Sequence, residues 1–105
     1  MSERRIRNDC ARCLSDLIIL GIIHKQPAHA YKIRKVILEK FGVALYSGVF
    51  YPRLRRLENS DIIKGRWETE GGRKKRVYNL TAYGNKLYSH AVDNCLLILK
   101  KLEES

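Results

Sequence analysis

Two groups of closely spaced cations are the residues of this sequence best suited to a chemical role. Arg53, Arg55 and Arg56 lie close together, and the run RKKR at residues 73–76 follows the glycine pair of "EGGRKKRVYNLT". Neighbouring like charges repel one another and add nothing to a core. Guanidinium groups donate paired hydrogen bonds to phosphates and base edges, and ammonium groups bind phosphates as point charges. Both groups fit a surface that meets a polyanion, although a cation run alone is more often a solvated face.

The residues that usually carry out catalysis are scattered. His24, His29 and His90 lie far apart in the sequence, and no Ser-His-Asp set, carboxylate pair or metal-spaced cluster is recognisable. His29 is expected to brace a turn rather than to act chemically. We therefore expect neither an enzyme nor a bound cofactor or metal.

The cysteines are expected to be structural. Cys10, Cys13 and Cys95 cannot form a complete disulfide framework, and their odd number fits a reducing compartment. Cys10 and Cys13 form a C-x-x-C in a predicted helix, without a second pair or a histidine at zinc-ligand spacing. Free cysteine otherwise behaves as a small hydrophobe. A redox or metal role for the three thiols is the alternative.

Composition indicates one globular domain with a basic body. The chain has 105 residues, is 45% hydrophobic and carries a formal net charge of +10. Residues 1–46 and 47–80 each contain nine Lys/Arg and four Asp/Glu, whereas residues 81–105 contain three of each. The basic part suggests a nucleic acid or an anionic membrane surface as partner. The longest apolar run, residues 17–23, is too short to span a bilayer, so we expect a soluble cytoplasmic protein.

The first part of the chain predicts a basic arm and two helices. Residues 1–8 form the arm, and apolar residues spaced by three and four predict a helix from about Asp9 to just before Pro27. A second helix is expected over residues 28–41, with Gly42 as its left-handed cap. Its inward side is expected to carry Tyr31, Ile33, Ile37 and Phe41.

A third helix is expected to begin at Ser47, whose hydroxyl can cap the exposed amides of the first turn. Its apolar residues recur at spacings of four and three and form one inward stripe, Phe50, Leu54 and Leu57. The opposite face carries Gly48, Val49, Pro52, Arg55 and Arg56, and the flanks carry Tyr51 and Arg53. Glu58 is close enough to pair with one of the three arginines.

Two short strands and a long helix complete the chain. Residues 61–68 and 75–80 read as strands around the turn "TEGGRK", which gives a hairpin with a charged tip. Thr81 is expected to cap a last helix over residues 82–103. Its apolar residues form two adjacent stripes, Gly84, Tyr88, Ala91, Cys95, Ile98 and Leu102 in the first, and Val92, Leu96 and Leu99 in the second.

Two apolar stripes are more than a domain of this size needs to cover its own core, so we expect part of this helix to face a second copy of the chain. The alternative is a broad core face within one chain. The residues expected at the dimer interface are Leu14, Leu17, Tyr88, Ala91, Cys95, Ile98 and Leu102.

The order of three helices and a hairpin predicts a mainly α fold with a small β-hairpin, a winged helix-turn-helix followed by a C-terminal dimerisation helix. Residues 1–81 would form the DNA-binding domain and residues 82–105 the dimerisation helix of the same compact unit. A helix fits the major groove, and basic side chains on a loop can bind the neighbouring phosphates. The residues expected to contact DNA are Ser47, Gly48, Tyr51, Arg53, Arg55, Arg56, Arg73, Lys74, Lys75 and Arg76.

Two segments resemble the PadR-like transcriptional regulators. "YPRLRRLENSDIIKG" is similar to the family's Tyr-Pro-x-Leu-x-x-Leu-Glu reading helix, and "RKKRVYNLTAYG" is similar to its post-wing motif. The matching residues are Tyr51, Pro52, Leu54, Leu57, Glu58, then Lys75 or Arg76, Tyr78, Leu80, Thr81 and Gly84, with Pro27, His29 and Tyr31 upstream. Where the family usually has glycine, this chain has Ala30 and Asp61, and Asp61 is expected to supply a side-chain bond at the helix end instead.

The resemblance implies a homodimeric transcriptional regulator, usually a repressor, that binds double-stranded DNA at a pseudo-palindromic operator. It also implies a place for a small-molecule effector, not identified by the sequence, that acts through the dimer helices. Some members bind planar drugs in an aromatic pore between subunits, but Trp67 lies in the predicted hairpin. A non-specific architectural protein or an RNA-binding winged helix is the competing interpretation.

Overall fold

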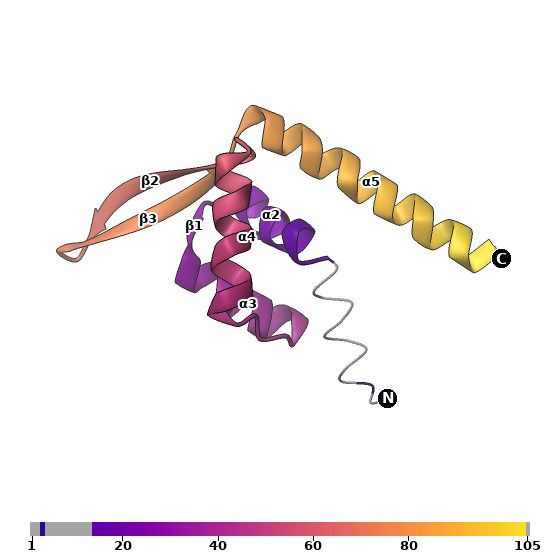
Figure 1. The fold of residues 1–105 in the computed structure, drawn as a ribbon, viewed down its shortest axis with the longest axis horizontal. Helices are drawn as coiled ribbons and strands as arrows, with labels where there is room; N and C mark the ends of the chain where they lie inside the picture. Colours follow the sequence, from indigo (N-terminus) through magenta and orange to yellow (C-terminus); the bar gives the residue numbers. More distant parts are fainter. Residues whose placement is uncertain (1–2, 4–13, 105) are drawn as a thin grey trace.

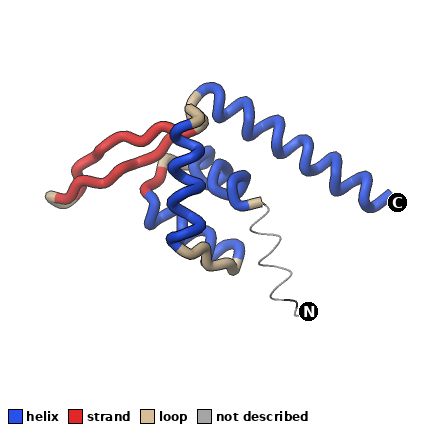
Figure 2. Tube along the Cα trace, in the orientation of Figure 1, coloured by secondary structure: helices blue, strands red, loops and turns tan. Residues whose placement is uncertain are grey.

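The computed structural model describes Glu3 and residues 14–104. The elements, in chain order, are α2 (Ser15–Lys25), β1 (Ala28–His29), α3 (Ala30–Phe41), α4 (Ser47–Asn59), β2 (Ile63–Glu70), β3 (Arg73–Leu80) and α5 (Ala82–Glu104). Helices α2, α3 and α4 form a compact body, from which the β2–β3 hairpin extends to one side and α5 to the other (Figure 1). The mainly α fold with a small sheet is therefore confirmed (Figure 2). Apart from Glu3, the basic arm lies outside the described residues, as do the predicted helix start near Asp9, Cys10 and Cys13.

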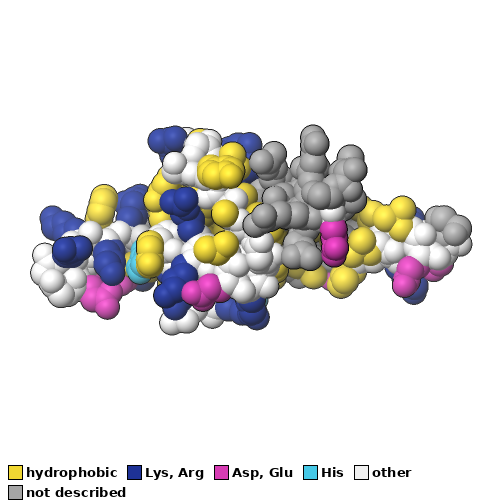
Figure 3. All heavy atoms as spheres, turned by 90° about the horizontal axis from the view of Figure 1, so that it is seen from below, with side chains coloured by type: hydrophobic (Ala, Val, Ile, Leu, Met, Phe, Trp, Pro, Cys, Tyr) yellow, Lys and Arg dark blue, Asp and Glu magenta, His cyan; other side chains and the backbone are white. Residues whose placement is uncertain are grey.

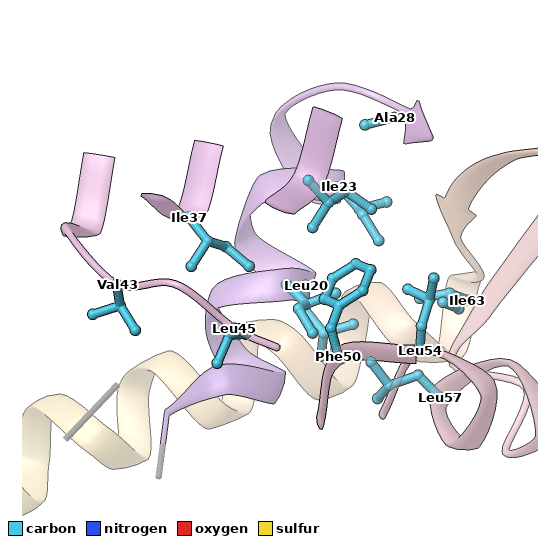
Figure 4. Close-up of a cluster of buried hydrophobic side chains, with 12 residues drawn as sticks. Leu20, Ile23, Ala28, Ile37, Val43, Leu45, Phe50, Leu54, Leu57 and Ile63 are labelled. Atoms are coloured by element: carbon cyan, nitrogen blue, oxygen red, sulfur yellow. The ribbon is translucent and has the colours of Figure 1, made fainter. Parts of the chain in front are cut away.

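The core is made by one apolar face from each helix of the body. Phe50 and Ile33 are fully buried, and the predicted α4 stripe is confirmed, with Leu54 and Leu57 almost fully buried beside Phe50. Side chains from α2, α3, α4 and β2 converge in this cluster (Figure 4). Burying each of these side chains stabilises the fold by about 1.5–3 kcal/mol.

The inward side predicted for α3 is only half right. Ile33 and Ile37 are buried, but Tyr31 and Phe41 are exposed. At 100° per residue, Tyr31 lies almost opposite Ile33, so a single apolar face cannot contain both. Phe41 is the last residue of the helix, just before the left-handed Gly42 (φ 67°) that ends it as predicted.

Helices α3 and α5 begin with a side-chain cap, whereas α4 does not. The Nδ1 atom of His29 accepts a hydrogen bond from the Lys32 amide at 3.3 Å, which is the bracing role expected for this residue. The hydroxyl of Thr81 accepts from the Gly84 amide at 2.9 Å, so Thr81 caps α5 as predicted. The cap predicted at Ser47 is wrong. Tyr46 is the N-cap of α4 and makes no side-chain cap bond; its backbone carbonyl accepts from the Val49 and Phe50 amides.

The sheet has one strand more than the sequence predicted. The order is β1-β3-β2, and β1 pairs antiparallel with β3 through Ala28↔Tyr78 and His29↔Val77. The hairpin itself is confirmed and is longer than predicted, since pairing continues to Glu70↔Arg73 around Gly71 and Gly72. Both glycines have positive φ, 57° and 78°, as a two-residue type I′ turn requires.

Asp61 does not take the role predicted for it. It adopts the left-handed conformation itself, with φ 61°, so the position needs the conformation for which glycine is usual. Its amide donates to the Glu58 carbonyl and the Ile62 amide to the Leu57 carbonyl, both at 3.0 Å. These two bonds form a Schellman motif, which closes α4 and turns the chain into β2.

Candidate nucleic-acid interface

Helix α4 presents a polar outer face on the side opposite its buried stripe. Gly48, Pro52 and Arg55 lie on this face and are exposed. A Cβ atom added at Gly48 would meet no atom within 4 Å, so the helix surface is open there. Within the part of the chain that the structure describes, Arg55 makes no ion pair. The guanidinium of Arg55 is thus available to an external acceptor.

The other two arginines of α4 are held by an acidic residue of α2. Asp16 accepts from Arg56 at 2.8 Å and from Arg53 at 3.3 Å. The pairing that the sequence suggested, between Glu58 and one of these arginines, is wrong, because Glu58 faces the hairpin instead. The structure therefore separates the arginine group of α4 into Arg55, which has no ion pair among the described residues, and Arg53 and Arg56, which are ion-paired.

Exposed tyrosines lie at the N-terminal ends of α3 and α4. Tyr46 and Tyr31 are 71% exposed, and Tyr51 is 41% exposed with its ring edge-on to Phe50. Arg34 lies over the Tyr51 and Phe50 rings and donates to the Leu45 carbonyl at 3.0 Å. Ser47, expected to contact DNA, is exposed at the N-terminal end of α4. Exposed phenol hydroxyls beside a helix start are suitable donors to phosphate oxygens.

The hairpin, called the wing below, consists of β2 and β3 and carries its charges on two faces. One face has Lys75 opposite Glu68 and Arg73 opposite Glu70, so acidic and basic side chains alternate across the strands. Lys75 also lies 3.9 Å from Glu70. Arg73 is exposed and, in the described residues, has no ion-pair partner.

Lys74 lies on the other face of the wing, opposite Thr69, and is also exposed. Arg73 and Lys74 are therefore free cations at the tip of the wing. In Figure 3, Lys and Arg side chains are scattered over the wing and the helical body, and several hydrophobic side chains are visible along α5.

Arg76, the last cation of the run, lies at the root of the wing rather than at its tip. It donates to Glu58 of α4 at 2.5 Å and lies over the rings of Trp67 and Tyr78. Glu58 also accepts from the Gly65 amide at 3.1 Å. A Cβ atom at position 65 would come within 2.5 Å of the Arg76 side chain, so glycine leaves room for this contact. Glu58 thereby joins the end of α4 to both strands of the wing.

The pKa values around Glu58 reflect this arrangement. The hydrogen bond that Arg76 donates to Glu58 raises the pKa of the Arg76 guanidinium, which stays charged. Burial raises the pKa of the Tyr78 hydroxyl, and the nearby Glu58 carboxylate adds to the rise.

The residues predicted at a dimer interface lie along α5 and beside an apolar groove. The groove measures about 720 Å³, lies between α2, α3 and the N-terminal half of α5, and is lined by Leu14, Leu17 and Tyr88 among others. Ala91 and Cys95 are half-buried, and Ile98 and Leu102 are 56% and 66% exposed. Cys95 is a free thiol. Part of the predicted set thus lines the groove, and the rest lies farther along α5.

Two further features are absent from the described residues. They include no group of three or more His, Cys, Asp or Glu side chains arranged to hold a metal ion. None of the helices in residues 14–104 has the length and apolar character needed to cross a membrane.

Sequence reasoning missed Asp16, Tyr46 and the bridging role of Glu58. Asp16 precedes its partners Arg53 and Arg56 by 37 and 40 residues in the sequence, so no local spacing pattern connects them. Tyr46 stands next to a residue that was identified as a cap, and its exposure depends on where the helix begins. The position of Glu58 in the family motif indicated that this residue matters, but it did not indicate that its partners would be Gly65 and Arg76.

Comparisons with known proteins agree with this geometry. The sequence pattern of the transcriptional regulator PadR-like family matches residues 19–90. An uncharacterized HTH-type transcriptional regulator of Methanocaldococcus jannaschii is 36% identical over 87 residues, which are 83% of this chain and 78% of that protein.

Solved structures show the same fold. A PadR family transcription regulator of Clostridium difficile has a TM-score of 0.81 at 26% identity, over 87% of this chain and 96% of that one. Bacillus subtilis PadR, solved in complex with operator DNA, has a TM-score of 0.68 at 24% identity, over 75% of this chain and 46% of its own. The chain belongs to the PadR-like family of transcriptional regulators.

Proposed function

We propose that the protein is a homodimeric, sequence-specific DNA-binding regulator that represses transcription by occupying an operator. The observation that carries this proposal is the open outer face of α4, which bears the unpaired Arg55, together with the free cations Arg73 and Lys74 at the far end of the neighbouring hairpin. The operator complex of the similarly folded Bacillus subtilis PadR supports the choice of duplex DNA as the ligand.

Helix α4 is assigned to the major groove. Arg55 projects from the face opposite the core and can form a bidentate pair with guanine. Gly48 lets the start of the helix approach the DNA closely, and Ser47 and Tyr51 can donate to phosphates beside the groove. Base reading is therefore assigned to Arg55, and positioning to the helix start.

The wing is assigned to the phosphate backbone. Arg73 and Lys74 are exposed at the tip, where long flexible side chains can reach phosphates without a fixed geometry. Lys75 is half-buried and faces Glu68 and Glu70, so its contribution is partly cancelled within the wing. Arg76 is assigned to holding the wing against α4 rather than to touching DNA.

The dimer is assigned to α5 and the neighbouring groove. The partner's last helix would cover the exposed residues Ile98 and Leu102 and extend into the groove lined by Leu14, Leu17 and Tyr88. Two reading helices related by a dyad would then enter successive major grooves, roughly 34–36 Å apart. Any small-molecule effector would act by changing that separation through the dimer helices.

The test is the selection of bound duplexes from a random DNA pool, followed by salt-dependent binding of two variants. Arg55→Ala should cost about 1–3 kcal/mol on the selected operator and relax preference at one base pair. Lys74→Ala should weaken operator and scrambled DNA alike and reduce the slope of log affinity against log salt by about one unit. A pool that yields no common sequence would favour the architectural alternative. Preference for RNA over duplex DNA would favour the RNA-binding one.

A further inference from the structure

Asp16 is the acidic residue in direct contact with the arginines of α4. It lies in the first turn of α2, and its two carboxylate oxygens accept one bond each, Oδ1 from Arg53 and Oδ2 from Arg56. The carboxylate is 38% exposed, and the arginine side chains are 29% and 61% exposed. Two guanidinium groups on one carboxylate reproduce the arrangement in which arginines bind a phosphate.

The two ion pairs remove cations from one flank of α4 only. At 100° per residue, Arg53 and Arg56 lie on the flank that faces α2, whereas Arg55 lies toward the wing. Arg55 therefore keeps its charge available, and the other two arginines are neutralised in part by a residue of the same chain. Because the pairs are half-exposed, each is worth only about 0–1 kcal/mol, so a phosphate is a serious competitor for either arginine.

We propose that Asp16 acts as an internal substitute for a DNA phosphate, which withholds Arg53 and Arg56 from the backbone and so limits non-specific binding. The inference rests on the proposed function, because it needs the α4 surface to meet DNA. A chain with a net charge of +10 has a strong sequence-independent attraction to any duplex. Asp16 reduces that attraction at the reading helix and leaves the base-reading Arg55 untouched, which makes Asp16 a specificity-determining residue.

The experiment compares Asp16→Asn with a matched control. Glu39→Gln removes the same charge from an exposed residue of α3 whose partner is Lys35, not an arginine of α4. Binding to the selected operator and to scrambled duplex is measured between 0.05 and 0.2 M salt. If Asp16→Asn frees two arginines for phosphates, its salt slope on scrambled DNA should exceed that of the control by about 1.8 units, a gap of about 12-fold over this salt range.

Two further variants separate withholding from mere support of the fold. Asp16→Glu keeps the carboxylate and should behave like wild type. Arg53→Gln with Arg56→Gln should leave the wild-type salt slope nearly unchanged, but should abolish the steeper slope when added to Asp16→Asn. A loss of about two units of slope from the arginine double variant in the wild-type background would overturn the proposal, because both arginines would then already contact phosphates.

The remaining outcomes also decide the matter. Equal slopes for Asp16→Asn and Glu39→Gln, or weaker operator binding by Asp16→Asn at unchanged slope, would show that Asp16 only braces α2 against α4. In both cases the wild type still selects an operator, so the proposed function stands and only this inference fails. A wild type that binds no duplex would overturn both.

Discussion

Helices α4 and α5 both carry a regular apolar stripe, but only α4 buries it. Phe50, Leu54 and Leu57 of α4 are 0%, 2% and 4% exposed. On α5, Tyr88, Ala91 and Cys95 are only half-buried, and the apolar residues closer to the C-terminus remain open, with Ile98 and Leu99 at 56% and 59%. The difference is that α4 packs inside the helical body, while α5 leaves the body after its first turns (Figure 1).

The contrast shows that the spacing of apolar residues identifies a helix face that will be buried, but not whether the same chain or a second chain buries it. The spacing of three and four is the same in both helices, and it cannot distinguish an intramolecular core from a seam between copies. A row of large apolar side chains this exposed is typical of an interaction surface. The following predictions examine whether α5 is completed by another chain as α4 is completed by its own.

The largest effect is expected for Ile98→Glu. This change places a charge in the proposed seam, where an unpaired buried charge costs about 3–5 kcal/mol, so the dimer should weaken by more than about a hundredfold. Sedimentation at micromolar concentration should show monomer or unfolded protein.

The control for this change is His90→Glu, which introduces the same residue on the exposed polar side of α5. This variant should sediment like wild type. A monomeric wild type, or equal behaviour of the two variants, would remove the basis for a dimer through α5.

A second pair of variants compares a leucine of α4, which is expected to stabilise the fold, with a leucine of α5, which is expected to stabilise the dimer. Leu54→Ala leaves a cavity in the core and should lower the free energy of unfolding by about 2–5 kcal/mol without changing the dimer dissociation constant. Leu99→Ala removes about 1.5–3 kcal/mol of burial from the proposed interface and should raise the dissociation constant more than tenfold. Urea unfolding and sedimentation measure the two quantities. If Leu99→Ala leaves the dissociation constant unchanged, Leu99 lies outside any dimer interface.

A third and smaller effect concerns one glycine from each helix. A Cβ atom at Gly84 of α5 would lie 2.0 Å from the backbone oxygen of Ile62, so Gly84→Ala should cost about 1–3 kcal/mol or more. Gly48→Ala in α4 meets nothing and should be neutral or slightly stabilising through helix propensity. Urea unfolding at fixed protein concentration compares them. Equal destabilisation by the two changes would mean that α5 does not cross Ile62 as closely as described.

Much of the fold was predictable because its signals are local. The Gly42 cap, the Thr81 cap and the two-glycine hairpin turn depend on residues within a few positions of one another. The buried stripe of α4 was equally readable, since a single helix period specifies it.

The remainder depends on contacts between distant parts of the chain. Strand β1 has only two residues and forms because β3 pairs with it. The sequence therefore contains no run of strand-forming residues from which β1 could be predicted. The ion pairs of Asp16 and Arg76 could not be predicted, because a charged side chain has many partners of opposite sign and the fold alone selects one. For the same reason, the list of expected DNA contacts contained both free and ion-paired cations.

The attachment of the wing through its root has a consequence for how such proteins can diverge. Glu58 holds Gly65 and Arg76 near the body, whereas the strands beyond Trp67 are joined chiefly to each other. Adding two residues to each strand would lengthen the wing and keep every side chain on its present face, since strands repeat every two residues. Adding one to each would exchange the faces and carry Lys74 to the opposite side of the hairpin. The wing can therefore lengthen or shorten by two residues per strand without changing how its root is attached to α4.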